Sequence, residues 1–365
     1  MNNRLQKFMD WMKQAGVDAS FITSKENVFY LSGFRSEPHE RLLGVLVFQD
    51  KDPILVCPAL DKEDAKNAGW NHEIIAHSDT DRPWDLIENR VNELFDQINV
   101  WAVEKEHMNV ERFEELQSRY PGSQLVSAEE KMKVLRLIKD EQELEILRKA
   151  AEFADYAVKL GVEEIAEGTS EMEIIAKIEY ELKKKGISEM SFSTMVLTGK
   201  NGASPHGNPG STKIQKGDLV LFDLGVVLDG YCSDITRTVA YGELNDKQLE
   251  IYNTVLKAQL AAVEAVKPGV KVSELDRIAR KTIEDAGYGE YFPHRLGHGL
   301  GISVHEYPDI KETNDLVLEE GMVFTIEPGI YVPNVAGVRI EDDILVTKDG
   351  YELFTKFPKE LQYVK

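Results

Sequence analysis

The sequence predicts two domains, a small α/β domain at the N-terminus and a larger α+β domain after it. The chain has 365 residues, a length that favours two domains over one. Strand-like and helix-like patterns alternate through residues 1–125, which is typical of an α/β fold. Residues 126–365 combine long helical stretches with strands, and from residue 292 on the strands and turns are punctuated by glycine and proline, so an α+β fold is expected there.

Local patterns define the elements of the first domain. Leu5, Phe8 and Met12 recur at helical spacing before Gly16 ends the run. A strand is expected at 19–23, an aromatic segment that turns at Gly33 at 28–34, and a hairpin at 42–57. Helices are expected at 59–68, 83–95 and 110–118, and strands between them at 74–76 and 100–103.

A change in amino-acid composition places the domain boundary near residue 125. Residues 127–167 are dense in Glu, Lys, Leu and Ala, with Leu137, Leu144 and Leu147 on one helical stripe. The Glu and Lys runs are interpreted as solvated helix faces. After these residues, a helix is expected at 169–185, a strand at 191–197 and a loop at 199–211. Two long helices follow at 245–266 and 272–286, and strands and turns fill 292–351.

The acidic composition narrows the range of partners. The 43 basic and 64 acidic residues give a formal charge of -21, so neither nucleic acid nor an anionic membrane is an expected partner. No apolar run reaches about 18 residues, and the polar N-terminal segment lacks the core of a secretory signal, so a cytoplasmic location is expected. The two cysteines, Cys57 and Cys232, exclude a disulfide scaffold and leave a single bridge open.

Residues 219–238, LVLFDLGVVLDGYCSDITRT, contain the strongest local signal. Two apolar runs joined by Asp-Gly at 229–230 predict a hairpin with a two-residue turn. This register places Asp223 opposite Thr236, and it places Asp234 on the same face, diagonal to Asp223. Two carboxylates on one apolar face are costly unless a cation lies between them or one of them takes up a proton.

Three further residues interrupt apolar or glycine-rich runs in the C-terminal half. Glu327 and Glu341 lie in strand-like segments, and His298 is flanked by glycines that allow a close backbone approach. For any single carboxylate, an Arg or Lys partner remains an adequate explanation. Together with Asp223 and Asp234, the three favour one shared site.

Four carboxylates and one imidazole form an oxygen-rich ligand set without thiolate. Such a set disfavours structural zinc and suits Mn²⁺, Co²⁺, Fe²⁺ or Zn²⁺ in a catalytic pair, with Mn²⁺ or Co²⁺ as the first expectation. Five side chains are too many for one small ion with an open position, so two divalent ions roughly 3.5–4 Å apart are predicted. Ions of this kind lower the pKa of a bound water from about 15.7 towards about 7.

These motifs resemble those of the pita-bread metallopeptidases, within them the branch of Xaa-Pro dipeptidase (prolidase) and aminopeptidase P. The matching segments are FDLGVVLDGYCSDITRT, HRLGHGLGISVHE, TIEPGIY and VRIEDD. The resemblance implies a creatinase-like α/β domain over 1–125. It further implies a pita-bread catalytic domain over 126–365, with a curved, mainly antiparallel sheet flanked by helices. A homodimer is also implied.

The resemblance implies a role for each site residue. The metal ligands would be Asp223, Asp234, His298, Glu327 and Glu341. Glu327 would also shuttle the proton, and His206 and His305 would stabilise the tetrahedral intermediate and the scissile carbonyl. His294 would contact the proline end of the substrate, and Arg339 would bind substrate or organise the site. For His294, the alternative is a histidine packed in the core. For Arg339, the alternative is a buried counter-ion to the carboxylates.

The implied activity is hydrolysis of the bond between an N-terminal residue and proline in a short peptide. The short N-terminal domain and compact chain favour a dipeptidase, and aminopeptidase P acting on longer peptides remains an alternative. A catalytically silent binding protein on the same fold is a second alternative, which the intact ligand set argues against. Creatinase lacks the ligands and methionine aminopeptidase usually lacks such an N-terminal domain, so both are disfavoured.

Overall fold

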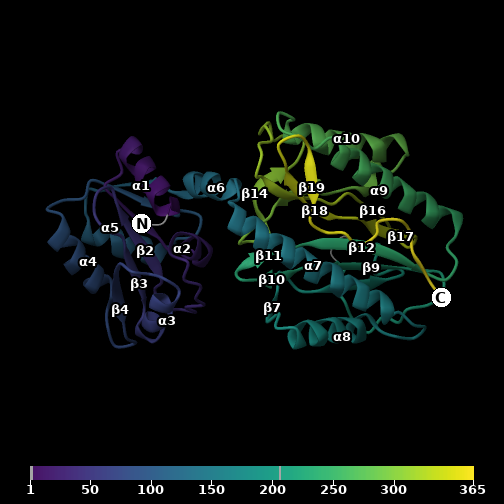
Figure 1. The fold of residues 1–365 in the computed structure, drawn as a ribbon, viewed down its shortest axis with the longest axis horizontal. Helices are drawn as coiled ribbons and strands as arrows, with labels where there is room; N and C mark the ends of the chain where they lie inside the picture. The colour runs from purple at the N-terminus through teal and green to yellow at the C-terminus, as the bar shows by residue number, and fades with distance from the viewer. Residues whose placement is uncertain (1–2, 205–206) are drawn as a thin grey trace. The chain divides into compact units, whose positions relative to one another are not determined.

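The computed structural model describes residues 3–204 and 207–365, which fall into two compact units divided between Arg136 and Leu137 (Figure 1). The boundary expected at 125/126 lies inside β6 (Gln124–Ser127). This strand pairs in parallel with β5 (Val100–Val103), so its residues complete the sheet of the first unit. β6 is short and only partly buried, and for that reason its pattern does not stand out in the sequence.

A six-stranded mixed sheet with the order β4-β3-β2-β1-β5-β6 forms the centre of the first unit. The other strands are β1 (Ala19–Ile22), β2 (Gly44–Phe48), β3 (Ile54–Pro58) and β4 (Glu73–His77). The helices are α1 (Asn3–Ala15), α2 (Lys25–Ser32), α3 (Lys62–Asn67), α4 (Pro83–Leu94), α5 (Val110–Arg119) and α6 (Glu129–Leu137). The predicted hairpin over 42–57 is present as the antiparallel pair β2 and β3.

The aromatic segment 28–34 lies largely in helix α2. Ser24 caps this helix by accepting a hydrogen bond from the Asn27 amide at 3.3 Å, and Gly33 ends it with a φ of 75°. The buried Glu104 carboxylate accepts the Ser24 amide at 2.8 Å and so fixes the start of the helix. Tertiary contacts therefore stabilise a helix in a run with strong strand propensity.

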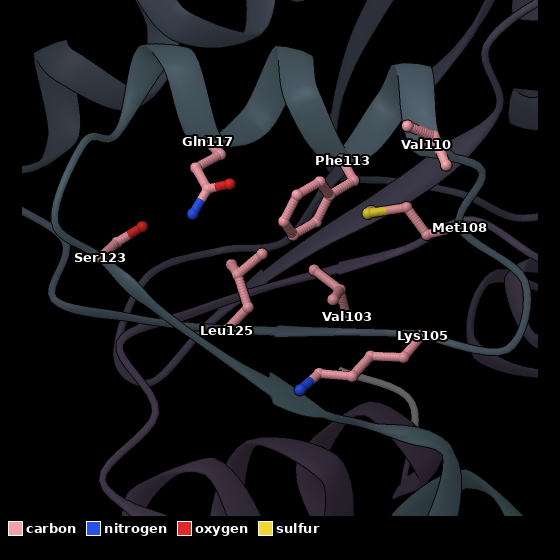
Figure 2. A pocket seen from close by; sticks show the side chains of 8 residues that line it. All are labelled: Val103, Lys105, Met108, Val110, Phe113, Gln117, Ser123 and Leu125. Carbon is pink, nitrogen blue, oxygen red and sulfur yellow. The ribbon is translucent and has the colours of Figure 1, made fainter.

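A pocket of about 420 Å³ lies in the first unit beside α5 (Figure 2). Val103, Val110, Phe113 and Leu125 supply apolar lining, and Lys105 adds a cation. Among the described residues, none of those predicted for the functional site lines this pocket.

Four small sheets and four long helices make up the described part of the second unit. The sheet orders are β11-β10-β7, β20-β12-β9-β8, β14-β13-β15-β18-β19 and β16-β17. The strands are β7 (Glu189–Met190), β8 (Met195–Thr198), β9 (Asp218–Leu224), β10 (Val226–Leu228), β11 (Tyr231–Cys232), β12 (Ile235–Tyr241), β13 (Gly297–Gly299), β14 (Glu306–Ile310), β15 (Val323–Ile326), β16 (Gly329–Val332), β17 (Ala336–Arg339), β18 (Asp342–Val346), β19 (Tyr351–Leu353) and β20 (Tyr363–Val364). The helices are α7 (Glu141–Glu163), α8 (Glu171–Lys184), α9 (Asp246–Glu264) and α10 (Val272–Asp285).

Two helix pairs cover these sheets and bury their apolar faces. Within the second unit, α7 and α8 lie on one side of the strands, and α9 and α10 lie on the other (Figure 1). Phe222 of β9 packs in a cluster with residues of α7 and α8, and Phe324 of β15 packs in a cluster with residues of α9 and α10. The mainly antiparallel strands flanked by helices confirm the predicted fold class.

The pairing register predicted for the hairpin over 219–238 is confirmed in its paired strands. Leu228 pairs with Tyr231, and Asp223 pairs with Thr236. Asp229 and Gly230 have φ values of 47° and 86°, the left-handed conformations that a two-residue turn requires.

Two further expectations concern cysteines and membranes. Cys57 and Cys232 are both buried and are not joined by a disulfide, so the single bridge left open by the sequence is absent. Across the described chain, no helix is both long and apolar enough to span a membrane.

Candidate metal centre

The five predicted ligands come from the strands of the second unit and the residues beside them. They are Asp223 in β9, Asp234 before β12, His298 in β13, Glu327 after β15 and Glu341 before β18. Antiparallel pairing places β9 beside β12 in one sheet, and β13, β15 and β18 side by side in another. The Glu341 amide donates to the carbonyl oxygen of Thr236 at 3.0 Å and so joins the two sheets.

Four of the predicted ligands converge. One ligand atom from each of Asp234, His298 and Glu341 lies within 4.8 Å of the other two. Nε2 of His298 is 3.6 Å from Oδ2 of Asp234 and 3.4 Å from Oε1 of Glu327. The side chains of Asp234 and His298 are 5% and 3% exposed, whereas that of Glu327 is 17% exposed, so Glu327 is the more open member.

Asp223 joins the cluster through Arg339. The Arg339 guanidinium forms an ion pair with Oδ2 of Asp223, and its Nε donates to Thr236 Oγ1 at 3.2 Å. Thr236 Oγ1 in turn donates to Oε2 of Glu341 at 2.7 Å. Arg339 is thus placed as a buried partner of the predicted ligands, in the position that the counter-ion alternative describes.

Tyr331 of β16 links this network to His294. Arg339 Nη1 donates to the Tyr331 hydroxyl at 2.6 Å, and Nε2 of His294 lies 3.1 Å from the same hydroxyl. Burial raises the pKa of Tyr331 to about 12, which keeps the hydroxyl protonated at neutral pH. The sequence did not indicate a site role for Tyr331 or Thr236, because the residues next to each of them in the sequence give no sign of a polar side-chain partner.

The remaining predicted residues are the histidines 305 and 206. The centroid of the His305 ring lies 4.2 Å from that of His298, and His305 as a whole is an exposed residue. Partial burial, together with the nearby Arg295 guanidinium, lowers the pKa of His305. His206 lies outside the described residues.

The carboxylates of the cluster repel one another, and the Arg339 guanidinium, paired with Asp223, offsets this repulsion only in part. Burial, and then repulsion from Glu341, raises the pKa of Asp234 and of Glu327 well above the ordinary values. Burial and the charge of Asp223 raise the pKa of Glu341 to about 7. Burial lowers the pKa of His298 to about 3, which leaves its imidazole neutral and able to act as a ligand.

Buried oxygen atoms without a hydrogen-bond partner indicate whether the converging residues could bind a metal ion. Among the described residues, Oδ1 of Asp234 and Oε1 of Glu341 are buried without a hydrogen-bond partner. Unpaired buried acceptors are rare, because leaving one costs roughly 1–3 kcal/mol or more. Both belong to residues of the converging group, so divalent cations bound there would satisfy them, and the donor set fits a metal site.

Glycines on both sides of His298 allow β13 to lie between two neighbouring strands. A Cβ on residue 297 would lie 2.0 Å from the carbonyl oxygen of Thr325, and one on residue 299 would lie 2.3 Å from that of Tyr307. Any larger residue would therefore push His298 out of the group. The close backbone approach expected from the sequence is made to β15 and β14.

A buried ion pair lies next to the ligand strands. Arg237 Nη2 donates to Oδ1 of Asp342 at 2.7 Å, and Arg237 Nη1 donates to the main-chain oxygen of Thr236 at 2.9 Å. Gln259 and Lys359 each donate to Oδ2 of Asp342 at 2.7 Å. This ion pair joins β12 to β18 beside the residues that carry Thr236 and Glu341.

For the metal-free protein, we expect stability to fall as pH rises. The folded pKa of Glu341 is raised from 4.5 to about 7, so between these values the folded state keeps a proton that the unfolded state has lost. The contribution of Glu341 to the free energy of unfolding then decreases with rising pH across this window. The raised pKa values of Asp234 and Glu327 act in the same direction, and these three carboxylates together outweigh the opposite contribution of His298, whose pKa is lowered. Protein treated with a chelator should melt several degrees lower at about pH 8 than at about pH 5.5, and metal should raise the melting temperature more at the higher pH. A melting temperature of the metal-free protein that is equal or higher at the higher pH would contradict this expectation.

With this geometry in view, comparison with known proteins gives a consistent result. Residues 145–348 match the model of metallopeptidase family M24, and residues 4–138 match the Creatinase/Prolidase N-terminal domain. The Bacillus subtilis (strain 168) protein YkvY, provisionally named a dipeptidase, is 58% identical over 359 residues, which cover 98% of this chain and 99% of the relative.

Two solved structures are similar over nearly the whole chain. The prolidase from Pyrococcus horikoshii OT3 is 40% identical with a TM-score of 0.90, and the match covers 99% of this chain and 100% of that one. The Xaa-Pro dipeptidase from Bacillus anthracis is 36% identical with a TM-score of 0.92, and the match covers 99% of both chains. The chain therefore belongs to the M24 metallopeptidases, the pita-bread family, in its prolidase branch.

Proposed function

We propose that the protein is a dinuclear-metal-dependent Xaa-Pro dipeptidase. The convergence of Asp234, His298, Glu327 and Glu341, with two buried oxygens left unpaired, is the observation that carries this proposal. The similarity to a prolidase and to an Xaa-Pro dipeptidase supports the substrate class.

The proposed cofactor is a pair of divalent ions. Asp223, Asp234, His298, Glu327 and Glu341 would hold them. When bound, such ions activate a water as nucleophile and polarise the scissile carbonyl. Oxygen-rich ligands favour Mn²⁺ or Co²⁺, and the same set also tolerates Zn²⁺ or Fe²⁺.

In this proposal the protein side chains move the proton and bind the peptide. Glu327, the most open of the converging carboxylates, would accept the proton of the attacking water and pass it to the proline nitrogen as the peptide bond breaks. His305 and His206 would donate hydrogen bonds to the developing charge. His294 would face the proline end, and Arg339 would hold Asp223 and Tyr331 in place.

The test of the activity uses three peptides. Purified protein loaded with Mn²⁺ or Co²⁺ should release proline from Ala-Pro, whereas Ala-Ala should remain intact. Cleavage of an Xaa-Pro-Xaa tripeptide with no cleavage of Ala-Pro would move the assignment to aminopeptidase P. If neither proline peptide is cleaved although two ions are bound per chain, the proline assignment fails. A chain that does not hold two ions after metal loading would instead favour the silent binding protein.

Two further properties are part of the proposal. We expect a homodimer, which the molecular mass in solution will test, and a cytoplasmic location, which cell fractionation will test. The strongly acidic composition, with a formal charge of -21, supports neither nucleic acid nor an anionic membrane as a partner.

A further inference from the structure

A buried ion pair between Lys139 and Glu306 lies beside the loop that carries His305. Nζ of Lys139 is 2.7 Å from Oε1 of Glu306, and the two side chains are 1% and 7% exposed. Among the ion pairs found in the described residues, few have both partners this deeply buried, whereas surface pairs contribute little. A pair of this kind fixes geometry, because removing one partner leaves the other charged and buried.

Lys139 is held rigidly at its backbone. Its amide donates to the carbonyl oxygen of Gly321 at 2.9 Å, and the preceding Ile138 forms a β-bridge with Met322. Asp140, the next residue, is the N-cap of α7 and forms a capping box with Glu143. The backbone of Lys139 is therefore fixed within the second unit, and this limits where its ammonium group can lie.

Glu306 is packed into the loop between β13 and β14. A Cβ on residue 301 would lie 2.5 Å from Oε1 of Glu306, so only glycine leaves room for the carboxylate there. Oε2 of Glu306 accepts the amide of Ser303 at 3.3 Å. The carbonyl oxygen of Gly301 accepts the amide of Cys232 at 2.7 Å, which ties the same loop to β11.

His305 directly precedes Glu306, and its ring lies against that of the predicted ligand His298. A carboxylate that is clamped on one side by Lys139 and on the other by the loop backbone leaves its neighbour little freedom to move. We propose that Lys139 and Glu306 are positioning residues for His305, acting through the shape of this loop. The inference rests on the proposed role of His305 in peptide hydrolysis.

The test compares Lys139→Met and Glu306→Gln with a matched control. Each variant should lower kcat for Ala-Pro by roughly 10- to 100-fold, because small misplacements of a reacting group reduce rates by about that much. Metal content should stay at that of the parent protein, since neither residue is a proposed ligand. Lys139→Arg should recover most of kcat. Arg148→Met is the control, because Arg148 of α7 pairs with Glu352 at 2.9 Å away from this loop, and it should change the melting temperature without changing kcat.

The same variants in a His305→Ala background separate positioning from general destabilisation. If the pair acts through His305, Glu306→Gln should lower kcat no further in that background, although it still lowers the melting temperature. The His305 side-chain NMR signals, assigned by their loss in His305→Ala among the eight histidines, should shift in Glu306→Gln and stay in place in Arg148→Met.

The possible failures are distinct from one another. Full activity of His305→Ala would remove the proposed role of His305, and this inference with it. Loss of activity in His305→Ala, with unchanged kcat in both Lys139→Met and Glu306→Gln, would overturn this inference alone. Loss of bound metal in the two variants, or additive loss of kcat in the His305→Ala background, would also overturn it, because the pair would then act elsewhere.

Discussion

Replacement of Glu327 by Gln is expected to abolish most of the turnover while leaving the fold intact. The amide matches the carboxylate in size but cannot accept the proton of the attacking water or return it to the proline nitrogen. Side-chain proton transfer of this kind contributes about one hundred- to ten-thousandfold, and kcat for Ala-Pro should fall by that factor. The KM should change far less, because the loss falls on the transition state.

Glu320→Gln is the matched control for this experiment. Glu320 is exposed and belongs to none of the contacts of the metal centre, so its replacement should leave kcat and the melting temperature unchanged. Near-normal activity of Glu327→Gln with full metal content would remove Glu327 from its role as proton shuttle. Loss of metal in that variant would instead assign Glu327 mainly to metal binding.

His298→Ala should lose both bound metal and activity. The neutral imidazole lies 3.6 Å from Asp234 and 3.4 Å from Glu327, so its removal takes away the one nitrogen donor among the proposed ligands. Metal analysis after loading and dialysis should find fewer ions per chain than in the parent protein. The activity on Ala-Pro should fall below detection.

A surface histidine provides the comparison. His107 lies in the first unit and is exposed, so His107→Ala should retain the metal content and kcat of the parent protein. Full metal occupancy in His298→Ala, measured under the same dialysis conditions, would show that the ligand set is different from the one proposed.

The hairpin over 219–238 could be predicted from sequence because its signal is entirely local. Asp-Gly at 229–230 permits the two left-handed residues of the turn, and the alternation of the strands then sets the pairing of Asp223 with Thr236. The same locality explains why the converging residues were found. Each of them interrupts an apolar or glycine-rich run, and such interruptions are visible without any knowledge of the fold.

Features that depend on partners far apart in the sequence could not be predicted in this way. Helix α2 forms in a run rich in Val, Phe and Tyr because Glu104, about eighty residues later, accepts the amide at its start. The network through Tyr331 and Thr236, and the pair formed by Lys139 and Glu306, likewise join residues whose own surroundings carry no signal. Pairing of this kind is decided by tertiary packing, which overrides local preference.

The arrangement at β12 and β18 limits how the length of these strands can change in evolution. Thr236 and Glu341 point to the metal centre, and the very next residues, Arg237 and Asp342, form the buried ion pair beside it. Gaining or losing one residue in either strand would exchange these two roles, because successive side chains point to opposite faces. In β18, the change would move Asp342 to the position of Glu341 and would separate its carboxylate from Arg237 and Lys359. Single-residue insertions and deletions within these strands should therefore be eliminated.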